Sequence, residues 1–134
     1  MAILVTGGAG FIGSHLIEKL LKTSDERIVA IDSFDPFYNP ARKRKNLAAV
    51  AENSRFTLVT GDVNDESVVE STWRTHSIRD VIHLAAHAGV RPSLERPLPY
   101  VDANVRGTLG LLEAARRHGC RRFLSASSAT VYGK

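Results

Sequence analysis

Residues 3–16 read ILVTGGAGFIGSHL, an apolar run that breaks into spaced glycines and then resumes with a helical spacing of apolar residues. The aliphatic residues 3–5 favour a buried strand. Gly7 permits a tight bend, Gly10 lets the backbone approach a phosphate, and Gly13 lets the following helix pack against its strand. Because a helix that opens on such a turn presents unpaired N–H groups, this stretch predicts a binding site for the diphosphate of a dinucleotide.

An acidic residue ends the next predicted strand, Arg27–Asp32. The Asp32 carboxylate is expected to accept hydrogen bonds from the adenosine ribose hydroxyls and to repel a 2′-phosphate, which favours NAD as the cofactor. Ser33, Arg42 and Lys43 lie nearby in the sequence, so NADP remains an alternative.

Short apolar runs alternate with helical patterns along the whole chain. The predicted strands are residues 2–6, 27–32, 55–60, 80–85 and 122–127, and the predicted helices are residues 11–22, 40–52, 65–76 and 99–118. This alternation is typical of an α/β fold with helices on both faces of a parallel sheet. Right-handed crossovers predict a doubly wound parallel sheet of the Rossmann type with strand order 3-2-1-4-5, and a ligand crevice between the first and fourth strands. The first two helices are expected on one face and the other two on the opposite face.

Helix ends are predicted from individual residues. Asn39 and Asn64 are the expected N-caps of the helices that follow them, and Gly119 is the expected end of the helix 99–118.

Further residues are expected at the edge of the sheet where the strands end. Asp62 and Val63 follow the third strand, where they either contact adenine or form a turn that caps the next helix. Ala85 and Ala86 are small and leave room for a flat ring. Ser127 and Ser128 lie at the carboxyl end of the fifth strand, where they are either ligand contacts or a polar strand end. The predicted cofactor-binding residues are therefore Gly7, Gly10, Phe11, Ile12, Gly13, Asp32, Ser33, Asp62, Val63, Leu84, Ala85, Ala86 and Ser127.

The composition of the chain limits the classes of protein to which it is expected to belong. The chain has 134 residues, a net charge of +4 and one cysteine, Cys120, which fits one domain in a reducing cytoplasm. No apolar run approaches the roughly 20 residues that span a bilayer, and a signal peptide is not expected. The basic clusters at residues 42–45 and 116–122 lie on predicted helix surfaces and helix ends, where solvated charge is ordinary. Nucleic acid, which favours a basic face with interleaved aromatic residues, is therefore not an expected partner. His83 is expected to be buried and hydrogen-bonded; it and His87 lack a third ligand, so no metal site is expected.

The predicted helix 99–118 carries two neighbouring apolar stripes, one of which contains Val101, Val105, Leu109 and Leu112. Either the helix is well buried on the sheet, or it also packs against a second helix. We expect self-association through this helix, because an uncovered apolar stripe favours contact with another copy.

Four motifs follow one another along the chain: TGGAGFIGSHL at 6–16, GDVND at 61–65, HLAAHAGVRPSLERPLPYVDANVRGTLGLLEAA at 83–115, and SSATVYG at 127–133. In their order and spacing the chain resembles the extended short-chain dehydrogenase/reductase family, and most of all its nucleotide-sugar epimerase branch. The segment FDPFYNPARKRKNL at 34–47 is similar to the UDP-glucuronate 4-epimerases in particular. The resemblance implies that NAD takes a hydride from C4 of a nucleotide sugar and returns it to the other face of the 4-keto intermediate. It also implies that Ser128 is an active-site residue, and Arg91 is a candidate contact for the diphosphate or a sugar carboxylate.

The chain departs from the family's pattern in two places, at the base pair and at the acidic residues of the dehydratases. The family's Tyr-x-x-x-Lys base pair has no counterpart in the sequence, and the family's sugar-binding domain would follow later. The resemblance therefore implies that residues 1–134 are an incomplete NAD-binding domain, inactive alone. Ala129 and Thr130 stand where family dehydratases carry acidic residues, which disfavours dehydration. A stand-alone dinucleotide-binding or interaction module, and a 4,6-dehydratase or 4-keto reductase, remain the alternatives.

Overall fold

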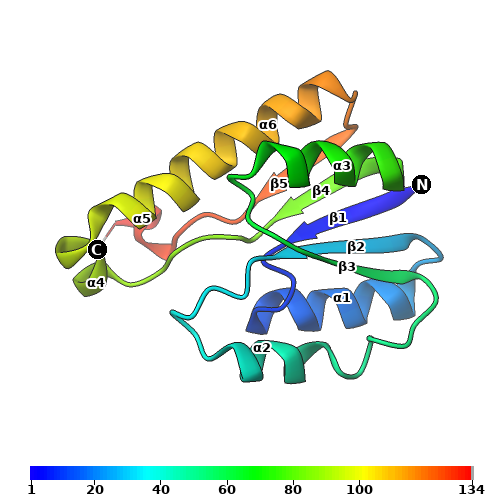
Figure 1. The fold of residues 1–134 in the computed structure, drawn as a ribbon, viewed down its shortest axis with the longest axis horizontal. Coiled ribbons are helices and arrows are strands. Elements are labelled where there is room, and N and C mark those ends of the chain that lie inside the picture. Colours follow the sequence, from blue (N-terminus) through cyan, green and yellow to red (C-terminus); the bar gives the residue numbers. More distant parts are fainter. Residues whose placement is uncertain (134) are drawn as a thin grey trace.

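The computed structural model describes residues 1–133, so the predicted domain end at Lys134 lies outside the described residues. Within them, a parallel sheet lies between two layers of helices (Figure 1). Its strands are β1 (Ala2–Thr6), β2 (Arg27–Asp32), β3 (Phe56–Thr60), β4 (Ile78–His83) and β5 (Arg122–Ser125). The order β3-β2-β1-β4-β5 confirms the predicted doubly wound topology.

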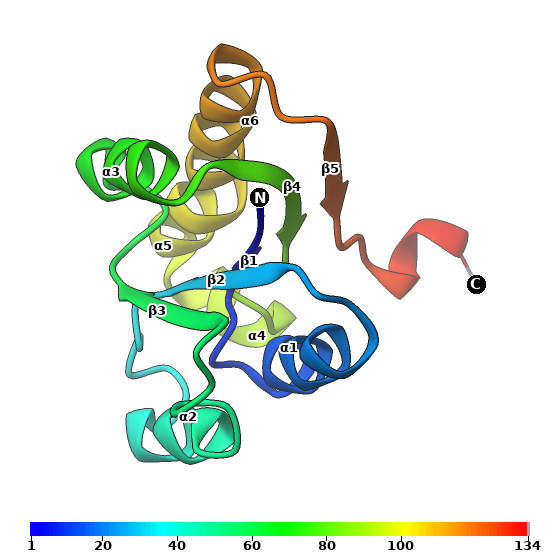
Figure 2. The ribbon, with the colours of Figure 1, turned by 90° about the vertical axis from the view of Figure 1, so that its right-hand side faces the viewer.

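The helices cover both faces of the sheet. They are α1 (Phe11–Thr23), α2 (Pro40–Leu47), α3 (Glu66–His76), α4 (Val90–Glu95), α5 (Pro97–Val101) and α6 (Thr108–Arg117), with a π-helical segment, Asp102–Gly107, and a short 3₁₀ segment, Ala129–Tyr132. Figure 2 shows α1 and α2 on one side of the sheet and α3 and α6 on the other. This division is the predicted one. Within the described part of the chain, no helix is long and apolar enough to cross a membrane.

The core consists of two apolar clusters, one on each face of the sheet. In β1, Leu4 belongs to the cluster on the face of α3 and α6, whereas Ile3 and Val5 belong to the cluster on the face of α1 and α2. The residues of β1 are buried throughout, because a central parallel strand is covered on both faces. Trp73 of α3 belongs to the first cluster and Ile17 of α1 to the second, so β1 is covered by a helical layer on each face.

Several predicted boundaries were wrong by a few residues. The helix expected at 40–52 ends at Leu47, the strand expected at 80–85 spans Ile78–His83, and the strand expected at 122–127 ends at Ser125. The ends of these elements are set by pairing with neighbours, which a one-dimensional pattern does not contain.

The predicted N-cap at Asn64 was also wrong. The Asp65 carboxylate caps α3 by accepting the amides of Ser67 and Val68. Asn64 lies one residue earlier, in a turn where its amide donates to the Asp62 side chain. The Asn39 cap of α2 is confirmed, because its side chain accepts the amide of Ala41.

The helix expected at 99–118 is not regular. The chain forms α5 from Pro97, then the π-helical segment Asp102–Gly107, then α6, and α4 lies in the stretch expected to be a loop. A π-helical turn shifts the side chains that follow it around the helix axis. Here the segment contains Asn104, whose side-chain amide pairs with the backbone N–H and carbonyl of His87 in the loop after β4.

Candidate functional site

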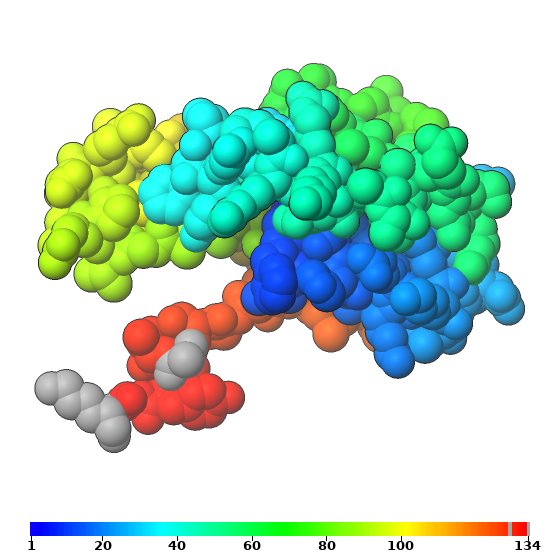
Figure 3. Space-filling model, turned by 90° about the horizontal axis from the view of Figure 1, so that it is seen from below, coloured from blue at the N-terminus to red at the C-terminus, as the bar shows by residue number. Residues whose placement is uncertain are grey.

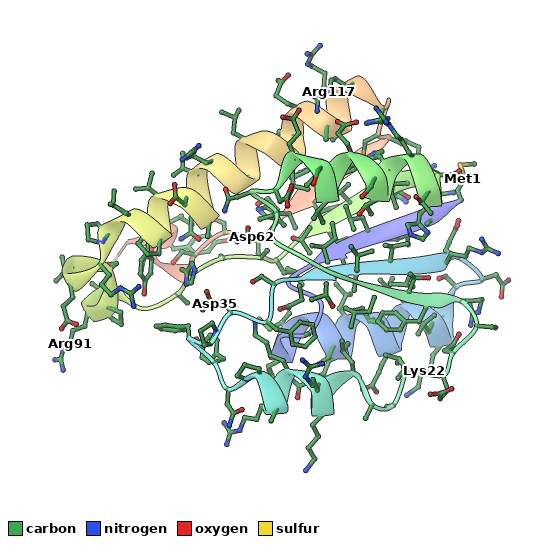
Figure 4. The ribbon with its side chains drawn as sticks, in the orientation of Figure 1. Met1, Lys22, Asp35, Asp62, Arg91 and Arg117 are labelled. Atoms are coloured by element: carbon green, nitrogen blue, oxygen red, sulfur yellow. The ribbon has the colours of Figure 1, made fainter. Side chains whose placement is uncertain are left out.

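A cavity opens at the carboxyl ends of the strands, where ligands bind in doubly wound sheets. It lies among the glycine turn after β1, the loops after β2, β3 and β4, and α2. Asp35 and Asp62 lie on two of these loops, at the same edge of the sheet (Figure 4). Of the residues predicted to bind the cofactor, the cavity is lined by Gly7, Asp32, Ser33, Asp62, Val63, Ala85 and Ala86.

The glycine turn leaves no space for side chains on its inner side. Gly7 has a φ of +67°, and a Cβ there would lie 2.9 Å from the backbone nitrogen of Ala85. A Cβ on Gly10 would lie 3.2 Å from the carbonyl oxygen of Gly7, and one on Gly13 would overlap that oxygen. The turn, α1 and the loop after β4 therefore approach one another as backbone, which keeps the turn open to a ligand.

The first turn of α1 has no capping side chain among the described residues. Gly10 is the N-cap, and its carbonyl accepts the amide of Ser14. The side chains of Phe11 and Ile12 are 73% and 69% exposed, and neither lines the cavity. The helix opening therefore offers backbone amides that no capping side chain occupies, which fits a diphosphate.

The Asp32 carboxylate is held inward at the end of β2, with 3% of its side chain exposed. Its Oδ2 accepts the backbone amide of Ala9 at 3.0 Å, and its Oδ1 accepts the amide of Phe34 at 2.8 Å. The Lys43 ammonium donates to the same Oδ1 at 2.9 Å. Asn46, one turn further along α2, donates to the carbonyl of Ala9 at 3.0 Å. The glycine turn and Asp32 are thus both bound to α2, the turn through Asn46 and the acid through Lys43. Neither Lys43 nor Asn46 was predicted to have this role.

A buried chain of hydrogen bonds supports the ends of β1 and β4. The amides of residues 84–85 donate to Thr6 Oγ1, which lies 2.6 Å from His83 Nδ1. His83 Nε2 lies 2.8 Å from Thr108 Oγ1, which donates to the carbonyl of Asn104. Since the Thr108 hydrogen is used, His83 donates from Nε2 and accepts at Nδ1, so the network assigns a neutral ring. Burial lowers the pKa of His83, and its prediction as a buried, hydrogen-bonded histidine is confirmed.

An aromatic bridge crosses the mouth of the cavity. The His87 ring lies 6.0 Å from Phe37, edge to face, and 5.4 Å from Tyr100 of α5. Its Nε2 is 3.9 Å from the carboxylate of Asp35. In Figure 3 the cyan loop after β2 lies against the yellow-green segment that contains α4 and α5. These contacts join loops far apart in the sequence, and no sequence pattern pointed to them.

Other predicted site residues lie away from the cavity lining. The side chain of Leu84 packs against the core beside α1. Arg91 is exposed on α4 and points outward (Figure 4). Ser127 and Ser128 are exposed after β5, and the Ser128 hydroxyl pairs with that of Thr130 at 2.8 Å. Figure 3 shows this last segment projecting from the body of the protein. Several predicted cofactor residues therefore line the cavity, whereas the predicted substrate residues Ser128 and Arg91 do not.

The chain matches known proteins along its whole length. Residues 4–134 match the family model described as GDP-mannose 4,6 dehydratase. A UDP-glucose 4-epimerase of Erwinia amylovora is 41% identical over 133 residues, which are 99% of this chain and 38% of that protein. UDP-glucuronate 4-epimerase 4 of Arabidopsis thaliana is 37% identical over 99% of this chain and 30% of its own length.

The crystal structure of a UDP-glucuronic acid 4-epimerase from Bacillus cereus, in complex with UDP-glucuronic acid and NAD, superposes with a TM-score of 0.89 at 39% identity. It is matched over 100% of this chain and 42% of that chain, so the chain spans less than half the length of these relatives. The predicted resemblance to nucleotide-sugar epimerases is confirmed. Its fold, its glycine turn and the match over residues 4–134 together show that the chain belongs to the GDP-mannose 4,6 dehydratase family, alongside nucleotide-sugar 4-epimerases.

Proposed function

We propose that this chain is the NAD-binding part of a nucleotide-sugar 4-epimerase. The observation that carries the proposal is the inward Asp32 carboxylate, which lines one cavity with Gly7 of the glycine turn and Asp62 after β3. A dinucleotide needs these three features together: a turn for the diphosphate, an acid for the ribose, and a slot beyond β3 for adenine. The relatives that carry NAD in their solved structures support the same assignment.

Each part of the cavity has a proposed task. The diphosphate lies against the turn and the opening of α1, which are residues 7–13, and the Asp32 carboxylate accepts the ribose hydroxyls. Asp62 accepts from the adenine amino group beside Val63, while Ala85 and Ala86 leave space for the nicotinamide half. When bound, NAD supplies the acceptor and donor of the hydride at C4 of the sugar. The residues of this chain bind and orient it.

The substrate side of the site is proposed from Ser127, Ser128 and Arg91. Ser128 would turn its hydroxyl from Thr130 to a sugar hydroxyl, and Arg91 would meet a diphosphate or a sugar carboxylate. Residues 1–134 contain no Tyr-x-x-x-Lys pair, which in the family takes the proton from that hydroxyl. We therefore expect cofactor binding without turnover of a nucleotide sugar.

Isothermal titration calorimetry of the chain with NAD and with NADP tests the cofactor assignment. We expect saturable binding of NAD, weaker binding of NADP, and loss of NAD affinity in the Asp32→Ala variant. The matched control is Asp25→Ala, because Asp25 is an exposed acid in the loop between α1 and β2. If neither dinucleotide binds with a Kd below about 1 mM, the proposed function is wrong.

Two further properties belong to this proposal. The apolar stripe on the segment 97–117 is exposed, and we propose that the chain self-associates through it. The protein would work in the cytoplasm, where a lone thiol such as Cys120 stays reduced. Cys120 is half-buried just before β5, and burial raises the pKa of its thiol.

A further inference from the structure

The four consecutive basic residues 42–45 do not share one environment. Arg42, Arg44 and Lys45 are exposed on α2, and the Arg44 guanidinium lies 5.1 Å from the centre of the Phe34 ring. Lys43 instead points into the cavity, with 13% of its side chain exposed, and pairs with the Asp32 carboxylate at 2.9 Å. One of the four cations is thus built into the predicted ribose site.

The position of Lys43 is fixed by contacts on both sides of it along α2. The Asn39 side chain caps the helix, and Asn46 donates to the carbonyl of Ala9 in the glycine turn. The amide of the same Ala9 donates to Asp32. Because the helix, the turn and the acid hold one another, the Lys43 ammonium stays beside the carboxylate and close to the cavity.

The Asp32–Lys43 pair has the hydrogen-bonding properties that suit a ribose hydroxyl. A hydroxyl both donates and accepts, so it can donate to the carboxylate and accept from the ammonium. A 2′-phosphate only accepts, and it would meet the Asp32 charge while the charge of Lys43 is already compensated. If the carboxylate charge is removed, the largely buried ammonium loses its counter-charge, and a 2′-phosphate becomes its natural partner.

We propose that Lys43 is a specificity-determining residue of this crevice: paired with Asp32 it selects an unphosphorylated ribose, and freed from that charge it recruits a 2′-phosphate. The proposal rests on the proposed cofactor site. It implies that the chain already contains a cation able to bind the 2′-phosphate of NADP, and that the charge of Asp32 prevents this binding.

The test compares the Kd values of NAD and NADP, measured by calorimetry, for the native chain and for Asp32→Asn. Asparagine keeps the shape and an acceptor for the Ala9 amide but removes the charge. We expect the ratio of the two affinities to move toward NADP by about 10- to 100-fold, the range of one charge-assisted hydrogen bond. In Asp32→Asn combined with Lys43→Met, this gain should disappear, since methionine retains an apolar stem without the charge.

The matched control is Lys45→Met, which removes an exposed cation from the same helix and should leave the ratio unchanged. If the native chain binds neither dinucleotide, the proposed function falls and this inference falls with it. If the native chain binds NAD but Asp32→Asn gains no affinity for NADP, or keeps its gain without Lys43, this inference alone is overturned.

A second variant covers the case in which Asp32→Asn does not fold, as judged by circular dichroism. Lys43→Met alone leaves the Asp32 charge uncompensated, so it should weaken NADP binding relative to NAD by about 10-fold. An unchanged ratio in this variant would contradict the role of Lys43.

Discussion

The hydrogen bonds around His83 favour the neutral form of its ring. Thr6 donates to Nδ1 and the ring donates from Nε2 to Thr108. A second ring proton, on Nδ1, would meet the hydrogen of Thr6, whose oxygen already accepts the amides of residues 84–85. Because the ring is buried beside the ends of β1 and β4, its pKa is lowered. Protonation of His83 therefore destabilises the folded state at the ends of β1 and β4, beside the crevice.

We expect this histidine to make the fold sensitive to mild acid. In the unfolded chain its pKa returns to about 6.5, so below that pH the unfolded state binds a proton that the native state refuses. The free energy of unfolding should fall as the pH is lowered through this range, until His83 is protonated in the folded state as well. Urea unfolding at several pH values between about 7.5 and 5.5 measures this decrease in the free energy of unfolding.

The His83→Gln variant should flatten this pH dependence, since glutamine donates and accepts without titrating. His15→Gln, on the exposed face of α1, is the control and should leave the slope as it is. If the glutamine at position 83 leaves the acid sensitivity intact, the assignment to this ring is wrong.

The second basic cluster was expected to be ordinary solvated charge, and this was wrong in part. Asp80 of β4 is buried, and the guanidiniums of Arg122, Arg121 and Arg79 donate to its carboxylate. The hydrogen bonds from Arg122, foremost, and from the other two hold the pKa of Asp80 well below its ordinary value. The arginine pair thus ties the start of β5 to β4.

Helices α1 and α6 each contain a glycine, and the two glycines have opposite effects on the stability of the fold. A Cβ on Gly13 of α1 would overlap the carbonyl oxygen of Gly7 and crowd the backbone of Gly8. A Cβ on Gly110 of α6 would have no heavy atom within 4 Å. The first glycine is required by the close approach of turn and helix, whereas the second weakens its helix without any packing reason.

Alanine substitutions should separate these two roles. Gly110→Ala is expected to stabilise the chain by about 0.5–1 kcal/mol, the difference in helix propensity. Gly13→Ala gains the same propensity, but overlap with backbone should make it destabilising by about 1–3 kcal/mol and weaken NAD binding. Urea unfolding of the two variants provides the comparison, and equal effects would refute the packing argument.

An apolar stripe on the outer side of the molecule is uncovered among the described residues. Along the π-helical segment and α6, Val105 and Leu109 are each 59% exposed, and Leu112 is 44% exposed, whereas Leu111 on the opposite side is fully buried. The helix therefore packs on the sheet with one stripe and presents the other to solvent. Of the two alternatives for this helix, burial of both stripes on the sheet was wrong.

Replacement of both Val105 and Leu109 by lysine should shift the chain toward monomer, because like charges would meet on an otherwise apolar surface. Sedimentation velocity over a wide concentration range measures the change. Val131→Lys, on an exposed apolar residue of the separate last segment, is the control. A native chain that stays monomeric at every concentration would contradict self-association.

The strand order, the two helical layers and the turn that opens α1 followed from local chemistry. A glycine-rich turn, apolar residues at strand or helix spacing, and right-handed crossovers are features of short stretches, so they can be recognised without knowing what lies beside them. Asp32 was found in the same way, because a residue that ends β2 reaches the crevice in any sheet of this topology.

The contacts within the crevice required the folded chain. Nothing in the run Arg42–Lys45 distinguishes Lys43 from its neighbours, since the rotation of α2 about its own axis selects which cation faces Asp32. The contact of His87 with Phe37 depends likewise on how far two loops reach across the sheet. Local sterics set the backbone elements of this protein, whereas the pairing of distant side chains depends on the packing that orients each element.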